Sequence, residues 1–148
     1  MTTTPVAHLN FRGEARAALE FYAAAFGGHA VVTTYADAGM PADAPGADRV
    51  VWGQATGADG FRVMAYDIPG AEPAPAAVTR RESGVTLTES PFFLALQGAT
   101  FEEASAHFER LADGATIVEP FAASPWSAGF GMLTDRFGVT WVIDVARA

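Results

Sequence analysis

The stretch GFGMLTDRFGVTWVIDV, residues 129–145, has the clearest strand and turn signals of this sequence. It reads as a strand, a tight turn and a second strand that is almost wholly apolar. Asp135 is a residue type that opens turns, and Gly138 is one that accepts a positive φ angle. We interpret the second strand as core on one face and as the wall of a cleft on the other.

The chain as a whole falls into two similar halves, the second of which ends with this segment. Residues 6–11 alternate between apolar and polar, which predicts a strand. From Glu14 the apolar spacing changes to three and four, which predicts a helix that stops at the glycine pair 27–28. Three further strands are predicted, in residues 30–35, 49–56 and 61–68. Residues 5–68 therefore form a first module of order βαβββ.

Residues 91–146 repeat this order. The sequence TFEE, residues 100–103, is a capping box in which the Thr100 side chain accepts from the Glu103 amide and Glu103 reaches back. An offset of 86 residues places Ala18 on Ala104 and Tyr22 on Phe108, and we interpret this as an internal duplication. The Pro-rich segment between the modules, residues 69–90, is predicted to be a linker or flexible loop.

These elements predict an α+β fold in which the two modules pair their sheets around a central cleft. Alternation along the strands sorts the side chains into two sets. Those expected under the helices are Leu9, Phe11, Val63, Leu94, Leu96, Val139, Trp141 and Ile143. Those expected to face the cleft are His8, Asn10, Trp52, Gln54, Arg62, Met64, Tyr66, Phe93, Gln97, Thr140 and Val142.

Composition excludes several functional classes. The 148 residues include no cysteine, which excludes disulfides, zinc–thiolate sites and iron–sulfur clusters. The net charge is −8, and all 9 basic residues are arginine, which argues against nucleic-acid binding. No apolar run approaches the ~18 residues of a membrane span, and no signal peptide is recognisable. We expect a soluble cytoplasmic protein.

Three stretches carry a resemblance to a known family: LNFRGEARAALEFYAAAFGG, MAYD, and SAGFGMLTDRFGVTWVI. Together they resemble the vicinal oxygen chelate superfamily, with the glyoxalase/bleomycin-resistance fold, and more narrowly its PhnB-like, demethylubiquinone-methyltransferase-like branch. The resemblance extends over residues 5–145 and is most specific in residues 126–141. It implies the same paired βαβββ arrangement.

The resemblance also implies where a metal would bind. Metal-dependent members use four ligands, one each from the first and last strand of each module. The corresponding positions here are Val6 or Ala7 (His8 if the register slips), Met64, Phe93 and Val142. Because Met64, Phe93 and Val142 do not coordinate divalent ions in the way His, Gln or Glu do, we expect no metal site and no cofactor.

The candidate site residues are those on the predicted cleft faces and two aromatics near the last hairpin. His8 is the one candidate base, Asn10 could orient a ligand beside it, and Arg62 could bind an anionic group. The full ligand-binding set is His8, Asn10, Trp52, Gln54, Arg62, Met64, Tyr66, Phe93, Gln97, Trp126, Phe130 and Val142.

Two functions from different classes follow from this sequence. The first is metal-free binding of a small apolar or aromatic molecule, as in bleomycin-resistance-type sequestration, by a homodimer that binds neither nucleic acid nor membrane. The second is a glyoxalase-like enzyme, an isomerase, lyase or dioxygenase, that is metal-dependent or uses His8 as base. A fold alone does not choose between them.

Overall fold

A computed structural model describes residues 2–147 of the chain. The chain divides into two compact units, and the boundary between them in the sequence falls between Ala74 and Pro75. Unit 1 contains β1 (Ala7–Phe11), α1 (Ala15–Ala25), β2 (His29–Thr34), β3 (Val50–Thr56), a 3₁₀ turn (Ala58–Gly60) and β4 (Arg62–Asp67). Unit 2 contains β5 (Thr79–Glu82), β6 (Val85–Thr88), β7 (Leu94–Gly98), α2 (Phe101–Leu111), β8 (Thr116–Ser124), β9 (Ser127–Thr134) and β10 (Thr140–Val145).

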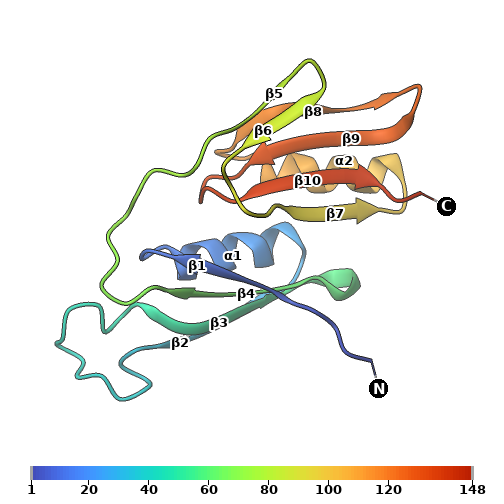
Figure 1. Cartoon of the computed structure of the whole chain (residues 1–148). Helices are drawn as coiled ribbons and strands as arrows, with labels where there is room; N and C mark the ends of the chain where they lie inside the picture. The colour runs from blue at the N-terminus through green and yellow to red at the C-terminus, as the bar shows by residue number, and fades with distance from the viewer. Residues whose placement is uncertain (1, 148) are drawn as a thin grey trace. The chain divides into compact units, whose positions relative to one another are not determined.

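The two units have the same sheet topology. Their strand orders are β1-β4-β3-β2 and β7-β10-β9-β8, so the first and last strands of each βαβββ module lie side by side (Figure 1). That pair lies at one edge of each sheet and is parallel, and the other neighbouring strands of each sheet are antiparallel. The predicted α+β class and the two βαβββ modules are confirmed.

Helix α1 packs on the sheet of unit 1 through the predicted apolar positions. Ala18, Leu19 and Tyr22 have no exposed surface. The helix approaches β3 so closely that a Cβ atom on Gly53 would lie 2.4 Å from the Leu19 Cδ1 atom. The N-terminus of α1 is satisfied by Asp67 at the end of β4, whose Oδ1 accepts from Gly13 N at 2.8 Å and from Ala15 N at 3.0 Å.

Helix α2 begins with the predicted capping box. Thr100 Oγ1 accepts from Glu103 N at 3.1 Å, and Glu103 Oε2 accepts from Ala99 N at 3.0 Å. The carboxylate therefore caps the amide one residue earlier than the box predicts. The helix buries Ala104, Phe108 and Leu111, the three positions of its predicted apolar stripe.

The turn between β9 and β10 is built around Asp135, as predicted. Its Oδ1 accepts from the amides of Phe137 and Val139, and its Oδ2 accepts from Trp141 Nε1 at 2.9 Å. Gly138 follows with φ of 84°. Val139 belongs to this turn and is half-buried, whereas Trp141 and Ile143 are buried as expected on the helix side.

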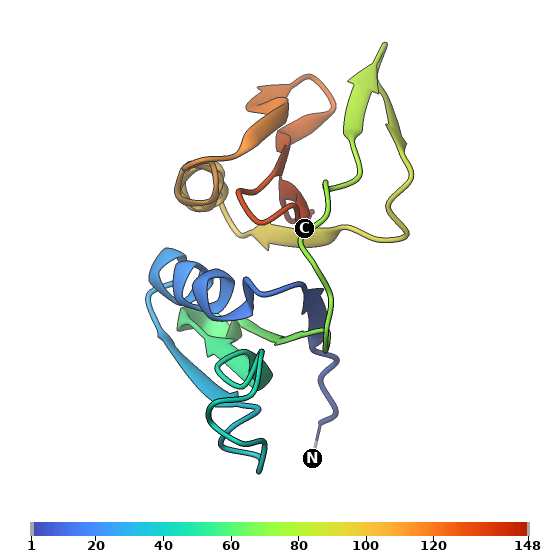
Figure 2. The same ribbon diagram turned by 90° about the vertical axis from the view of Figure 1, so that its left-hand side faces the viewer.

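Residues 69–90, for which the sequence predicts a linker or flexible loop, contain the hairpin β5–β6. Figure 2 shows this hairpin on the opposite side of the unit 2 sheet from α2, which is seen end-on. Thr86 donates to Met132 Sδ at 3.6 Å, and Thr79 lies 3.5 Å from Thr140 through their hydroxyls. The hairpin explains why Thr140, expected to face a cleft, is buried.

Candidate functional site

Seven predicted site residues lie on one face of the unit 1 sheet, the face turned away from α1, which we call outer face 1. They are His8, Asn10, Trp52, Gln54, Arg62, Met64 and Tyr66. His8 pairs with Met64 across β1 and β4, and Gln54 pairs with Met64 across β3 and β4. The alternation of the three strands therefore brings these side chains together.

His8 and Trp52 are the most distinctive groups on outer face 1. The His8 Nδ1 atom lies 3.1 Å from Asn10 Oδ1, and the His8 ring meets the Tyr66 ring edge-on with centroids 5.5 Å apart. Trp52 is 39% exposed, although β3 is the third strand of a four-stranded sheet. Asn10 is thus a neighbouring hydrogen-bond partner for His8. A partner of this kind holds an imidazole in the orientation that a general base needs.

A groove of about 870 Å³ lies in unit 2, along β8, β9 and the end of β10. Phe130 and Trp126, both predicted site residues, line it, and Trp126 is 81% exposed. Ala122 and Asp144 flank Phe130 on the neighbouring strands. The volume falls within the range of about 300–1,000 Å³ typical of sites for small organic ligands.

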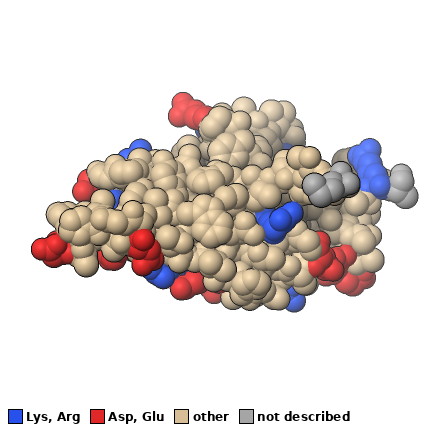
Figure 3. Space-filling view, turned by 90° about the horizontal axis from the view of Figure 1, so that it is seen from below, with Lys and Arg blue, Asp and Glu red and all other residues tan. Residues whose placement is uncertain are grey.

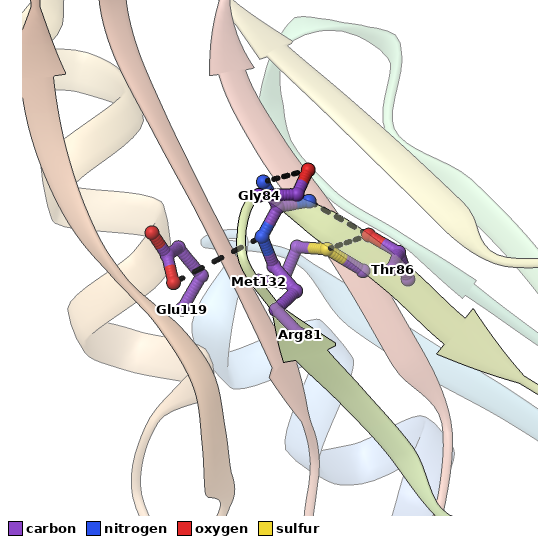
Figure 4. Close-up of polar contacts among 5 residues, drawn as sticks. All are labelled: Arg81, Gly84, Thr86, Glu119 and Met132. Atoms are coloured by element: carbon purple, nitrogen blue, oxygen red, sulfur yellow. Dashed lines mark hydrogen bonds and ion pairs between the residues drawn. The ribbon is translucent and has the colours of Figure 1, made fainter.

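The hairpin β5–β6 contributes a cation to this groove. The Arg81 guanidinium carbon lies 5.0 Å from the centre of the Phe130 ring, and Arg81 Nε lies 3.9 Å from Glu119 Oε2. Arg81 also donates to Thr86 Oγ1 at 2.7 Å and to the Gly84 carbonyl at 3.1 Å (Figure 4). The guanidinium is thus held over an aromatic ring beside a carboxylate.

Four charged residues of the groove, Arg81, Glu119, Asp144 and Arg147, are absent from the predicted site. Asp144 lies on the same face of β10 as Val142, in a strand otherwise made of apolar residues and one threonine. An acidic residue in such a strand was a sign, visible in the sequence, that this position could belong to a site. Arg81 gave no such signal, because it lies in the segment expected to be irregular.

The other predicted residues of unit 2 are spread along the strands β7 and β10. Val142 is half-buried between Ala95 and Met132, and Gln97 is exposed opposite Asp144. Phe93 precedes β7 and is half-buried outside the strand. None of these three lines the groove.

A smaller cavity of about 180 Å³ lies in unit 1, beside the loop that joins β2 to β3. Tyr35, Arg49 and Glu72 are the polar residues of its wall. Tyr35 donates to the Asp67 carbonyl at 2.7 Å, and partial burial, with smaller contributions from Tyr66 and Asp67, raises the Tyr35 pKa above 10.0. Arg49 Nη1 donates to the Ala71 carbonyl at 2.7 Å. The cavity would fit about one benzene-sized molecule, and it contains no predicted site residue.

The family model described as the glyoxalase/bleomycin resistance protein/dioxygenase superfamily matches residues 6–143. The chain belongs to this superfamily. This member is 38% identical to the protein YjdN of Escherichia coli K12 over 58 residues, which are 39% of this chain and 40% of the length of YjdN.

Two solved structures resemble the superfamily member along nearly its whole length. Protein PA1353 of Pseudomonas aeruginosa aligns with a TM-score of 0.76 and 26% identity, covering 99% of this chain and 100% of that one. The PhnB protein of Bacillus cereus, described as a putative 3-demethylubiquinone-9 3-methyltransferase, aligns with a TM-score of 0.70 and 25% identity, covering 97% and 100%. The predicted resemblance to the superfamily and to PhnB-like proteins is confirmed.

The side chains at the ligand positions expected for a metal-dependent superfamily member do not suit a divalent ion. On the parallel strand pair of each sheet, His8 lies opposite Met64 and Ala95 lies opposite Val142. Ala95, and not Phe93, is therefore the β7 residue in register with Val142. Within residues 2–147, no cluster of three His, Cys, Asp or Glu side chains could hold a metal. His8 alone is a good ligand among the four.

Proposed function

We propose that this protein binds a small organic molecule with an apolar or aromatic part in the groove of unit 2. The observation that carries the proposal is the ligand-sized groove lined by Phe130 and by an 81% exposed Trp126. Exposure of this much indole surface to water is unfavourable. Stacking against a planar ligand would bury that surface and so favour binding. Binding without chemical change would be a resistance or sequestration type of function.

The chemistry of the groove supports a ligand that is held by packing and by a few polar contacts. Ala122, Ala128 and Val145 provide small apolar surfaces around Phe130, while Ser127 and Asp144 provide polar groups. Arg81, Glu119, Ser124 and Arg147 also line the groove, so polar groups that can orient a ligand lie beside the apolar surfaces. The superfamily description includes bleomycin resistance proteins, which is consistent with a binding function.

Tryptophan fluorescence tests this proposal directly, because the three tryptophans lie in different surroundings. In a Trp52→Phe background, Trp126 is the one exposed indole that remains, since Trp141 is buried. A screen of aromatic compounds should find ligands that quench or shift this emission and raise the melting temperature. A ligand at about 100 times its Kd adds about 2.7 kcal/mol to the free energy of unfolding.

Trp52→Ala and Trp126→Ala form a matched pair for locating the site. Trp126→Ala should weaken binding by about 1 kcal/mol or more, about fivefold in Kd, because a stacked aromatic pair contributes that much beyond its buried area. Trp52→Ala should leave Kd unchanged. The reverse result would assign the ligand to outer face 1 and overturn the groove as the site.

An enzyme is the second candidate, favoured by the 3.1 Å contact between His8 Nδ1 and Asn10 Oδ1. In this reading His8 takes a proton from a small molecule bound on outer face 1, and Asn10 holds the imidazole. Proton NMR of each ligand found in the screen, followed over time with the protein, tests it. Conversion that disappears in His8→Ala would favour the enzyme, and unchanged ligand would favour binding alone.

A homodimer and a cytoplasmic location also belong to this proposal. Within the described residues, no helix has both the length and the apolar character needed to cross a membrane. Light scattering coupled to size-exclusion chromatography should give about twice the 15.5 kDa mass of one chain. A mass of one chain would refute the dimer.

A further inference from the structure

Arg81 occupies a position that a cationic ligand could take. It comes from the hairpin β5–β6, and its guanidinium lies over the ring of Phe130, 5.0 Å from the ring centre. Only 19% of its side chain is exposed, against 59% for the neighbouring Arg80. A cation over an aromatic face within about 6 Å is attracted by the ring quadrupole, and more strongly where water is excluded. The Phe130 ring is therefore a surface of the groove that accepts a flat cation.

The contacts of Arg81 with the groove wall are incomplete. Its two terminal nitrogens donate to Thr86 and Gly84, both on its own hairpin. Its Nε atom is buried without a hydrogen-bond partner, and the 3.9 Å to Glu119 Oε2 is longer than a hydrogen bond. The guanidinium thus makes closer polar contacts with its own hairpin than with Glu119 of the groove (Figure 4). A ligand that reaches Glu119 directly would replace a poor contact by a good one.

A second carboxylate makes the groove more favourable for a cation. Asp144 lies opposite Phe130 on β10, and Glu119 lies opposite Met132 on β8. Both carboxylates line the groove on the two sides of β9, and Arg147, beyond the end of β10, is a second cation of its lining beside Arg81. The protein as a whole has 17 acidic and 9 basic residues, so its field attracts cations.

We propose that the groove selects organic cations, guanidinium or ammonium groups attached to an aromatic or apolar body, and that Arg81 is a tethered competitor for this position. The inference rests on the proposed binding function and specifies its ligand class. A bound cation lies over Phe130 near Glu119 and Asp144, and Arg81 moves aside with its hairpin. Binding is therefore weaker than the groove alone would allow.

Three probes of nearly the same shape but different charge test the ligand class: benzylguanidinium, benzylurea and phenylacetate. In the Trp52→Phe protein, titrations followed by Trp126 emission should give the lowest Kd for benzylguanidinium. Glu119→Gln and Asp144→Asn should each raise that Kd about threefold to tenfold, the range expected for a lost cation contact of this strength. Neither change should affect the Kd of benzylurea.

Replacement of Arg81 tests the competition, because it predicts a gain of affinity. Arg81→Met should lower the Kd of benzylguanidinium about threefold to tenfold by freeing the Phe130 ring. Arg81→Lys keeps the positive charge and should change the Kd less. Arg80→Met is the matched control on the same strand, because Arg80 pairs with Glu82 and does not line the groove. It should leave the Kd unchanged.

Hydrogen exchange in the Trp52→Phe protein gives a test that keeps Arg81. Saturating benzylguanidinium should speed amide exchange in residues 79–88, whereas benzylurea should not. Slower exchange there, or a Kd raised by Arg81→Met, would overturn the competition.

Equal affinity for all three probes, or tightest binding of phenylacetate, would refute the cation selectivity and leave the groove as a binding site. If no probe of any charge, and no compound of the aromatic screen, changes Trp126 emission, the proposed function itself fails.

Discussion

Two buried aspartates hold the backbone at the ends of the central strands. Asp67 is 1% exposed and accepts from three amides, those of Gly13, Ala15 and Val50, at 2.8–3.0 Å. Asp135 is 4% exposed and accepts from two amides and from the indole of Trp141. A buried carboxylate is tolerated where its oxygens are satisfied in this way. Both residues stabilise the units, and neither is free to act as a catalytic acid.

The different surroundings of Trp141 and Trp52 predict different costs of truncation. Trp141→Ala should lower the free energy of unfolding by about 3–5 kcal/mol, because the residue is 1% exposed and its loss leaves a cavity. Trp52→Ala should cost about 1 kcal/mol, since 39% of its surface already meets water. Urea denaturation of both variants checks this, and equal costs would contradict the assignment of the two sheet faces.

Asp37 predicts a local pH dependence in the loop after β2. Its Oδ2 accepts from Thr34 N at 2.9 Å, and this bond, followed by the Thr34 hydroxyl, lowers the Asp37 pKa below 3.8. Because the pKa is lowered in the folded protein, the stabilising contact is present above the ordinary value. It is lost as pH falls through the lowered one. Carbon-13 NMR of the carboxyl group should show this pKa.

Thr34→Val is the control for that titration. It removes the hydroxyl and keeps the Thr34 amide, so the Asp37 pKa should rise only part of the way toward its ordinary value. A pKa of Asp37 at or above 3.8 in the unsubstituted protein would show that the turn is not held by this carboxylate.

At the scale of elements, the helices begin in different ways. Helix α2 is capped locally by Thr100 and Glu103, within five residues of sequence. Helix α1 has no side-chain cap at Glu14 and depends on Asp67, more than 50 residues away. The start of α2 therefore depends on local sequence, whereas the start of α1 requires the sheet to be formed.

Thr100→Ala should destabilise unit 2 by about 1 kcal/mol, because the Glu103 amide loses its acceptor. Thermal denaturation should show the melting temperature fall by about 2–4 °C. Thr100→Ser keeps the hydroxyl oxygen, so the melting temperature of this variant should fall by much less. If the serine variant melts as early as the alanine variant, the hydroxyl cap does not contribute to stability.

The whole chain carries a net charge of −8. On the face shown in Figure 3, most of the surface is uncharged and acidic side chains lie along its edges. Such a field acts over distances of about 10 Å at an ionic strength of about 0.1 M. Its effect should therefore be seen in salt dependence more than in any single contact.

Salt should weaken binding of benzylguanidinium and leave benzylurea unaffected. From about 0.05 to about 0.5 M NaCl we expect the Kd of the cation to rise about threefold, because counterions screen the acidic field. Isothermal titration calorimetry at a series of salt concentrations checks this. A salt-independent Kd for the cation would show that the net charge plays no part in binding.

Much of the candidate site was predictable because strand alternation is a local property. His8, Met64 and Gln54 share one face, as their positions in the sequence required. The groove was only half predicted, through Trp126 and Phe130. Arg81 reaches it by the docking of a hairpin from a Pro-rich segment, and no periodic pattern in that segment indicated a strand.

The local sequence pattern indicated the elements of the two βαβββ modules, their buried faces, the α2 cap, the Asp135 turn and the superfamily, but not the hairpin β5–β6. Each of these depends on residues a few positions apart, whose relative directions the backbone geometry sets. The capping of α1 by Asp67 and the covering of Met132 and Phe130 by Thr86 and Arg81 became visible in the folded structure alone. Those contacts join segments about 50 residues apart, where the choice of partner depends on the packing free energy of the folded unit. Local pattern does not encode that energy.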